Sequence, residues 1–241
     1  MSESTTRHSA PDDAREDPPL IVAIDGPAGG GKSTAARRLA ERLGVPYLDT
    51  GAMYRAVALA VLDSGADPDD RDAVLSVARR ADLSLVGQDD GTFAVQLDGR
   101  PVESRIRAPR VGEAASKVST LPEVRQRLVA LQRASAQRLG GVLEGRDIGT
   151  HVFPDTPYKF FVSARVEIRA ERRYEQLRGM GKDVTREEVL RELRERDERD
   201  TGREASPLPV DDSYVEVDTS DLSVDEVVDR MEQAVKERRE A

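Results

Sequence analysis

The chain has 241 residues, enough for one domain with its own hydrophobic core and a small appendage. It contains no cysteine, which excludes disulfides, thiolate metal sites and a cysteine nucleophile, and its only histidines are His8 and His151, which argues against ordinary zinc sites and Ser-His-Asp hydrolases. The net charge of −9 lies at the ends, because residues 1–19 carry −3 and residues 211–241 carry −7, which leaves +1 for the body.

The first 19 residues are polar and lack the basic start and apolar run of a signal peptide, so we expect a disordered tail. No apolar run approaches the roughly 20 residues that a membrane-spanning helix needs. No basic stripe interleaved with aromatic residues is present either, which argues against a nucleic-acid partner. The sequence therefore predicts a cytoplasmic protein that contacts neither membrane nor nucleic acid.

From Leu20 onwards, short apolar runs alternate with helix-compatible stretches. The first run, LIVAI, is followed by a glycine-rich loop and a predicted helix over 32–43. A strand at 45–49 then leads into a helix expected from about Ala52 to Leu62, and further strands are expected at 141–144, 158–164 and 213–218. This alternation predicts a parallel sheet covered by helices on both faces, with any ligand site at the carboxyl ends of the strands. The stretch 83–104 instead predicts an antiparallel hairpin inserted as a small subdomain.

The glycine-rich loop carries the most specific motif of the sequence. It consists of Gly26, Pro27, Ala28, Gly29, Gly30, Gly31, Lys32, Ser33 and Thr34, which match the pattern G-x-x-x-x-G-K-[ST] between a strand and a helix. Glycines let successive backbone N–H groups turn inward, and together with the helix N-terminus these donors make an anion site. In such a phosphate-binding loop (P-loop), Lys32 would reach the β- and γ-phosphates of ATP and the Ser33 hydroxyl would ligate Mg²⁺.

A P-loop alone leaves several classes open: a GTPase, an ATP-driven motor, a sulfotransferase-like relative or a small-molecule kinase. The sequence has no N-K-x-D motif of the kind that reads guanine, which weakens the GTPase hypothesis. It also has no apolar run ending in Asp-Glu of the kind that motor ATPases use.

Polar residues follow two further predicted strands. Thr50 and Arg55 start the helix after the second strand, where they could hold a sugar and a phosphate; the alternative is that Thr50 caps the helix and Arg55 lies on the surface. Arg146 and Asp147 follow the strand over 141–144 and again offer a donor and an acceptor at a carboxyl end.

The stretch 191–203 is rich in both charges, and most of it is typical of a solvated helix with opposite-charge pairs. Arg196, Asp200 and Arg203 are nevertheless spaced four and three apart and fall on one helical face. They favour an arginine-bearing flap that closes over a triphosphate, with a hinge expected at residues 178–182.

Taken together, these motifs resemble those of the bacterial cytidylate (CMP/dCMP) kinases. The resemblance runs from about Leu20 to the C-terminus and rests on IDGPAGGGKST, LDTGAMYR, IRAPRVGEAASKVSTLPEVRQRL, EGRDIGTHVFPD and RERDERD followed by Arg203 and PL. It implies an α/β P-loop kinase fold with a central parallel sheet flanked by helices, a small antiparallel β insertion for monophosphate binding within about 64–128, and a helical lid over about 178–204.

The resemblance also implies a monomeric enzyme that moves the γ-phosphoryl group of ATP, with Mg²⁺, to CMP or dCMP. Catalysis would depend on Lys32, Arg196 and Arg203. The implied contacts are Ser116, Arg125 and Asp147 with cytosine, Thr50 and Asp200 with the ribose, and Arg55, Arg146, Arg196 and Arg203 with the phosphates. Some family members carry Ser where this chain has Thr50, which leaves the preference between CMP and dCMP open. A UMP-preferring kinase and a non-catalytic nucleotide sensor are the alternatives.

Overall fold

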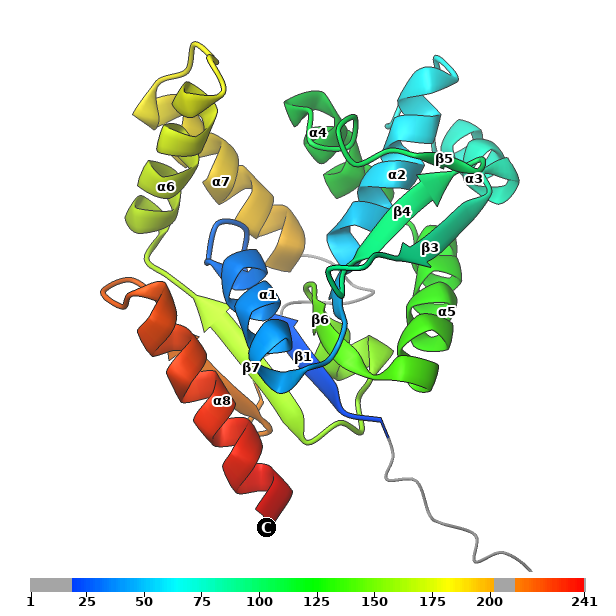
Figure 1. Cartoon of the computed structure of the whole chain (residues 1–241). Coiled ribbons are helices and arrows are strands. Elements are labelled where there is room, and N and C mark those ends of the chain that lie inside the picture. Colours follow the sequence, from blue (N-terminus) through cyan, green and yellow to red (C-terminus); the bar gives the residue numbers. More distant parts are fainter. Residues whose placement is uncertain (1–18, 202–210, 241) are drawn as a thin grey trace, which may run out of the picture.

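Five parallel strands form the central sheet of the computed structural model, which describes residues 19–201 and 211–240. The strand order across the sheet is β2-β6-β1-β7-β8 (Figure 1). The strands are β1 (Ile21–Asp25), β2 (Tyr47–Asp49), β6 (Gly141–Glu144), β7 (Tyr158–Ser163) and β8 (Tyr214–Asp218). Residues 1–18 of the expected tail and Arg203 lie outside the described residues.

The sheet is buried on both faces, which explains why its strands are continuous apolar runs rather than alternating ones. Val22 and Ile24 of β1 pack on one face with helices α1 (Lys32–Leu43) and α8 (Val224–Glu240). Ala23, between them, points to the opposite face, which is covered by α5 (Pro122–Leu139) and by the short π-helix η1 (Ile148–Val152). The predicted α/β fold with a helix-flanked parallel sheet is confirmed.

Between β2 and β6 the chain builds an insertion with a separate hydrophobic core. Its helices are α2 (Thr50–Asp63), α3 (Arg71–Arg80) and α4 (Pro109–Val118), followed by α5. The hairpin expected over 83–104 is confirmed: β3 (Leu83–Gly87) pairs antiparallel with β4 (Phe93–Leu97), which pairs with β5 (Arg100–Pro101).

Two expected boundaries on the second strand and helix differ from the structure for local reasons. The strand begins at Tyr47, because Pro46 has no N–H to donate to a neighbouring strand. Helix α2 begins at Thr50, two residues early, because the Asp49 side chain accepts a hydrogen bond from the Ala52 N–H and so caps it.

Helices α6 (Val166–Gly179) and α7 (Arg186–Thr201) form a hairpin that stands over the carboxyl edge of the sheet, opposite the insertion (Figure 1). A small apolar cluster that includes Leu177 and Leu193 holds the two helices together. The expected hinge at 178–182 is placed at the tip of this hairpin, where α6 ends. A change of backbone angles there would move α7 relative to α6 rather than swing both helices together.

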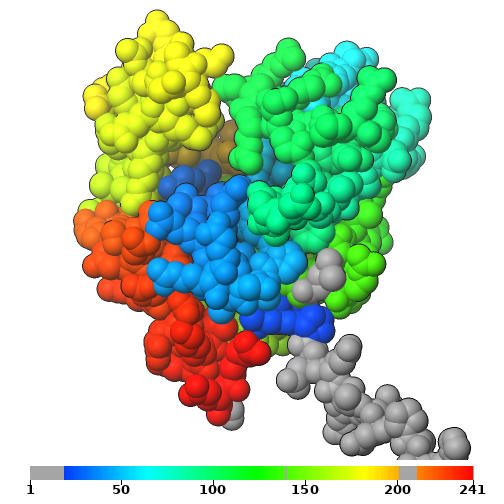
Figure 2. Space-filling model, in the orientation of Figure 1, coloured from blue at the N-terminus to red at the C-terminus, as the bar shows by residue number. Residues whose placement is uncertain are grey.

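The α6/α7 hairpin and the insertion leave a hollow between them above the sheet, which Figure 2 shows between the yellow and green surfaces. The carboxyl ends of β1 and β6 and the start of α1 lie at its base. No helix of the described residues is long and apolar enough to cross a membrane.

Candidate functional site

The P-loop joins β1 to α1 at the base of the hollow, and its backbone is fixed by its neighbours. Gly26 has a φ of +141°, and a Cβ atom there would lie 2.0 Å from the Val162 carbonyl oxygen, so only glycine fits. Three carbonyls of the loop accept hydrogen bonds from side chains: Pro27 from Lys32 (2.7 Å), Ala28 from Arg169 (3.1 Å) and Gly30 from Thr219 (3.1 Å).

Lys32 is buried in this loop and lies near other cations. Burial lowers the pKa of its ammonium group to about 7, and the positive charges of Arg146 and Arg196 add to the effect against the attraction of Glu144 and Asp25. Because this pKa lies near neutral pH, an anionic ligand beside Lys32 would favour its protonated, charged form.

This pKa gives a testable prediction for nucleotide binding. The phosphates of ATP would raise the pKa of Lys32, so we expect proton uptake on ATP binding at pH 7.5 and much less uptake at pH 6. The measurement is the dependence of the calorimetric binding enthalpy of ATP with Mg²⁺ on the ionisation enthalpy of the buffer. Lys32→Arg, whose guanidinium is always charged, should bind with little uptake. An enthalpy independent of buffer at pH 7.5 would contradict this assignment.

Ser33, next to Lys32, meets an acidic residue that the sequence analysis did not select. Its hydroxyl donates to Glu144 Oε2 at 2.9 Å, and the other oxygen of Glu144 accepts from the Tyr47 hydroxyl. Burial raises the pKa of Glu144. A hydroxyl and a carboxylate side by side are hard oxygen donors of the kind that Mg²⁺ takes beside nucleotide phosphates, so the residues fit the ion. The sequence signal that could have identified Glu144 is its place at the end of a buried strand.

On the insertion side, Thr50 and Arg55 belong to α2, which starts at the carboxyl end of β2. The Thr50 hydroxyl donates to the Glu144 carbonyl at 2.7 Å, so Thr50 is buried and is not the helix cap. Arg55 pairs with Asp49 at 2.6 Å, and its Nε is buried with no hydrogen-bond partner in the described part of the chain. Arg55 is therefore not the plain surface residue of the alternative interpretation.

The three residues expected to contact a nucleobase come from separate elements. Arg125 of α5 forms a buried ion pair with Asp147, which follows β6. Ser116 of α4 is buried, and its hydroxyl accepts from Arg199 Nε of α7 at 3.3 Å. Arg199 was not predicted, because its side chain is not distinguishable in sequence from the other charges of that helix.

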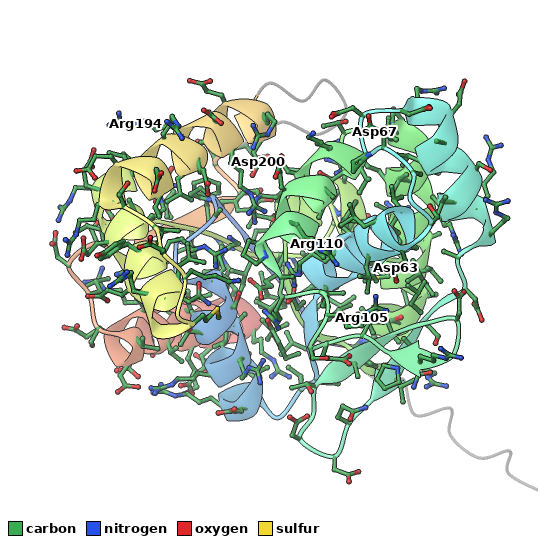
Figure 3. All side chains as sticks on the ribbon, turned by 90° about the horizontal axis from the view of Figure 1, so that it is seen from above. Asp63, Asp67, Arg105, Arg110, Arg194 and Asp200 are labelled. Atoms are coloured by element: carbon green, nitrogen blue, oxygen red, sulfur yellow. The ribbon has the colours of Figure 1, made fainter. Side chains whose placement is uncertain are left out.

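Helix α7 also contributes side chains to this group, on the side that faces the insertion. Asp200 is 1% exposed and accepts from Arg146 Nε at 2.9 Å; Figure 3 shows it on the side of α7 that faces α4. Arg196, one turn earlier, is close enough to Lys32 to help lower its pKa. The structure thus brings together all predicted site residues that it describes, and Arg203 lies outside the described residues.

Asp25, the last residue of β1, is a second buried acid that the sequence analysis missed. Its oxygens accept from the Ile148 and Gly149 N–H groups and from the Tyr214 hydroxyl, each at 2.8 Å. Burial raises its pKa to about 6. Asp25 therefore fastens the segment after Arg146 and Asp147 to the strand that precedes the P-loop. No cluster of three or more metal-ligating side chains occurs among residues 19–201 and 211–240.

Sequence comparison with known proteins identifies a family that this chain matches. The family model described as cytidylate kinase matches residues 22–237. A cytidylate kinase of Caldanaerobacter subterraneus subsp. tengcongensis is 47% identical over 89% of this chain and 94% of its own. A cytidylate kinase of Corynebacterium glutamicum is 50% identical over 88% of this chain and 92% of its own.

Among solved structures, a gluconokinase from Sinorhizobium meliloti 1021 aligns with a TM-score of 0.45 and 16% identity, covering 92% of this chain and 94% of that one. The family match and the two curated relatives each span nearly the whole length that carries the P-loop, the insertion and the α6/α7 hairpin. On these grounds the chain belongs to the cytidylate kinase family.

Proposed function

We propose that this chain transfers the γ-phosphoryl group of ATP to CMP or dCMP, which gives ADP and CDP or dCDP. The observation that carries the proposal is the similarity along nearly the whole chain to proteins named cytidylate kinase. The site supports it, because a P-loop for the donor lies beside a group of arginine, acidic and hydroxyl side chains suited to a second nucleotide.

The donor half consists of the P-loop, Lys32, Ser33 and Glu144. The buried ammonium of Lys32 would contact the β- and γ-phosphates, which makes it sensitive to their charge. Mg²⁺ would be held by Ser33, with Glu144 beside it, and would supply positive charge that offsets the charge of the phosphates. The Ser33 hydroxyl and Glu144 are already within hydrogen-bond distance, so little rearrangement is needed.

The acceptor half consists of residues from the insertion, from the segment after β6 and from α7. Arg55 and Arg146 would bind the phosphate of CMP, and the acids that hold them, Asp49 and Asp200, keep their guanidinium groups at the carboxyl edge of the sheet. Thr50 and Asp200 would face the ribose. Each of these roles is assigned because the residue lies in a motif that matches the corresponding motif of the family.

The reaction itself needs no strong base. The phosphate of CMP is already anionic at neutral pH, so the barrier is lowered by in-line placement of donor and acceptor and by neutralisation of the charge that spreads over the transferred group. Lys32, Arg196 and Arg203 are the cations proposed for that role. Closure of the α6/α7 hairpin over the site would exclude water, which would otherwise hydrolyse ATP.

Base recognition would depend on Asp147, with Arg125 holding its carboxylate in place. The carboxylate can accept from the exocyclic amine of cytosine, whereas uracil presents a carbonyl at that position. A mismatched buried polar pair costs about 1–3 kcal/mol, or roughly fivefold to 150-fold per contact.

Asp147→Asn is therefore expected to lower kcat/KM for CMP by roughly fivefold to 150-fold and to reduce the preference for CMP over UMP. Steady-state kinetics with both nucleotides measures this change. Asp155→Asn, which removes the same charge from an exposed position, is the matched control and should leave both values within about twofold. An unchanged CMP to UMP ratio in Asp147→Asn would refute the assignment.

The proposed function is tested by coupled detection of ADP with ATP, Mg²⁺ and one of CMP, dCMP, UMP or AMP. We expect rapid turnover with CMP or dCMP and kcat/KM at least about tenfold lower with UMP and AMP. Equal or faster turnover of UMP would indicate a uridylate kinase. Binding of ATP without ADP production under any condition would indicate a nucleotide sensor instead.

A further inference from the structure

Arg169 of α6 joins three parts of the protein with one buried guanidinium group. Its side chain is 7% exposed. It donates from Nε to the Ala164 carbonyl at 3.0 Å, from one terminal nitrogen to the P-loop carbonyl of Ala28 at 3.1 Å, and from both terminal nitrogens to the carboxylate of Asp197 at 3.0 and 2.6 Å. The P-loop lies directly against it, because a Cβ atom on Gly29 would lie 3.2 Å from Arg169 Cβ.

Asp197 of α7 lies close in sequence to the two residues of that helix that are expected to face the site. The residue before it, Arg196, is proposed to be catalytic, and one turn later Asp200 is buried against Arg146. The carboxylate of Asp197 thus connects α7, which carries Arg196 and Asp200, to the guanidinium of Arg169. The same guanidinium donates a hydrogen bond to the P-loop. Neither Arg169 nor Asp197 is needed to contact substrate in the proposed reaction.

We infer that Arg169 and Asp197 act as a positioning pair that sets α7, and with it Arg196 and Asp200, relative to the P-loop. The inference rests on the proposed function, since it concerns the placement of residues that serve phosphoryl transfer. A planar guanidinium donates in fixed directions, so the contact with Ala28 and the bidentate contact with Asp197 fix the distance and the angle between loop and helix together. The ammonium of lysine cannot reproduce that geometry.

The expected effect is on chemistry more than on substrate affinity, because a shift of about 1 Å at a reacting group can cost roughly 100-fold in rate. We expect Arg169→Lys and Asp197→Asn each to lower kcat by about tenfold to 100-fold. The double variant should lose no more of kcat than the more impaired single variant, because both substitutions break the same bidentate contact. The ratio of ADP to CDP formed should rise above one, because a misplaced α7 lets water compete with CMP.

The hairpin provides a matched control. Arg186 of α7 makes a bidentate ion pair with Glu171 of α6, at 2.6 Å for both contacts, but the pair is exposed and does not contact the P-loop. Arg186→Lys also replaces a guanidinium that makes a bidentate contact between α6 and α7. We expect kcat of this variant to stay within about twofold of the unmodified enzyme. This comparison separates cohesion of the hairpin from its position over the P-loop.

The experiment measures kcat, KM for CMP, and ADP and CDP yields for the unmodified chain and the four variants. If the unmodified chain fails to phosphorylate CMP, the proposed function fails. If it is active and Arg169→Lys keeps kcat within about threefold, or loses rate with an unchanged ADP to CDP ratio, the positioning inference is wrong, because loss of folded enzyme lowers the rate without altering that ratio. If Arg169→Lys does not fold, Asp197→Asn is judged by the same criteria.

Discussion

Arg196→Ala is expected to lower kcat by about 10³–10⁵-fold, by analogy with transition-state arginines of other phosphoryl-transfer enzymes. Its charge acts on Lys32, so it lies within electrostatic range of the P-loop lysine. A cation that is needed only while charge spreads over the transferred group affects kcat and leaves the ground state largely unchanged. We therefore expect KM for CMP to change by less than about tenfold.

Steady-state kinetics and calorimetric binding of CMP measure the two effects separately. Arg194→Ala is the matched control, because Arg194 belongs to the same helix but is 59% exposed and lies on its outer side (Figure 3). Its exposed contact with Glu167 contributes little, so we expect kcat within about twofold. Equal fractional changes of kcat and KM in Arg196→Ala would count against its catalytic role.

Gly26→Ala is expected to lower the free energy of unfolding by roughly 3–5 kcal/mol and to abolish ATP binding. The new Cβ atom would lie 2.0 Å from the Val162 carbonyl oxygen, and that oxygen belongs to β7 and cannot move without disrupting the sheet. For a chain of this length the midpoint of thermal unfolding should fall by about 6–20 °C.

Gly44→Ala separates the clash from the backbone angle. Gly44 also has a positive φ, +66°, but no atom lies within 4 Å of its Cβ position. Only the left-handed conformation is then penalised, at about 1–2 kcal/mol, and ATP binding should persist. Similar losses of stability in the two variants, measured by thermal unfolding, would show that the contact with Val162 is unimportant.

Local sequence patterns were sufficient for most elements that position the site. The helix over 32–43 and the strand over 141–144 begin and end as expected, because a glycine or a charged residue limits each apolar pattern. The rule that parallel strands end at one edge then brings residues such as Thr50 and Arg146 together.

Contacts between distant segments could not be predicted in the same way. Arg169 lies in a stretch of alternating charges, and its burial follows only from the packing of α6 against the P-loop. Glu144 and Asp25 are short-range neighbours of predicted site residues, but their partners, Tyr47 and Tyr214, come from other strands. The glycines at 179 and 181, which suggested a hinge, are equally suited to the tip of a helical hairpin, where the structure places them.

The central claim is that arginines from separate elements converge on the phosphates of two nucleotides, and a crystal structure with CMP, Mg²⁺ and a non-hydrolysable ATP analogue tests it most directly. We predict that Arg55 and Arg146 lie within about 3.2 Å of the CMP phosphate oxygens and that Arg196 lies between the two nucleotides. Guanidinium groups of Arg55 and Arg146 that lie beyond hydrogen-bond distance of the CMP phosphate, with Arg196 turned away from the bound phosphates, would contradict it.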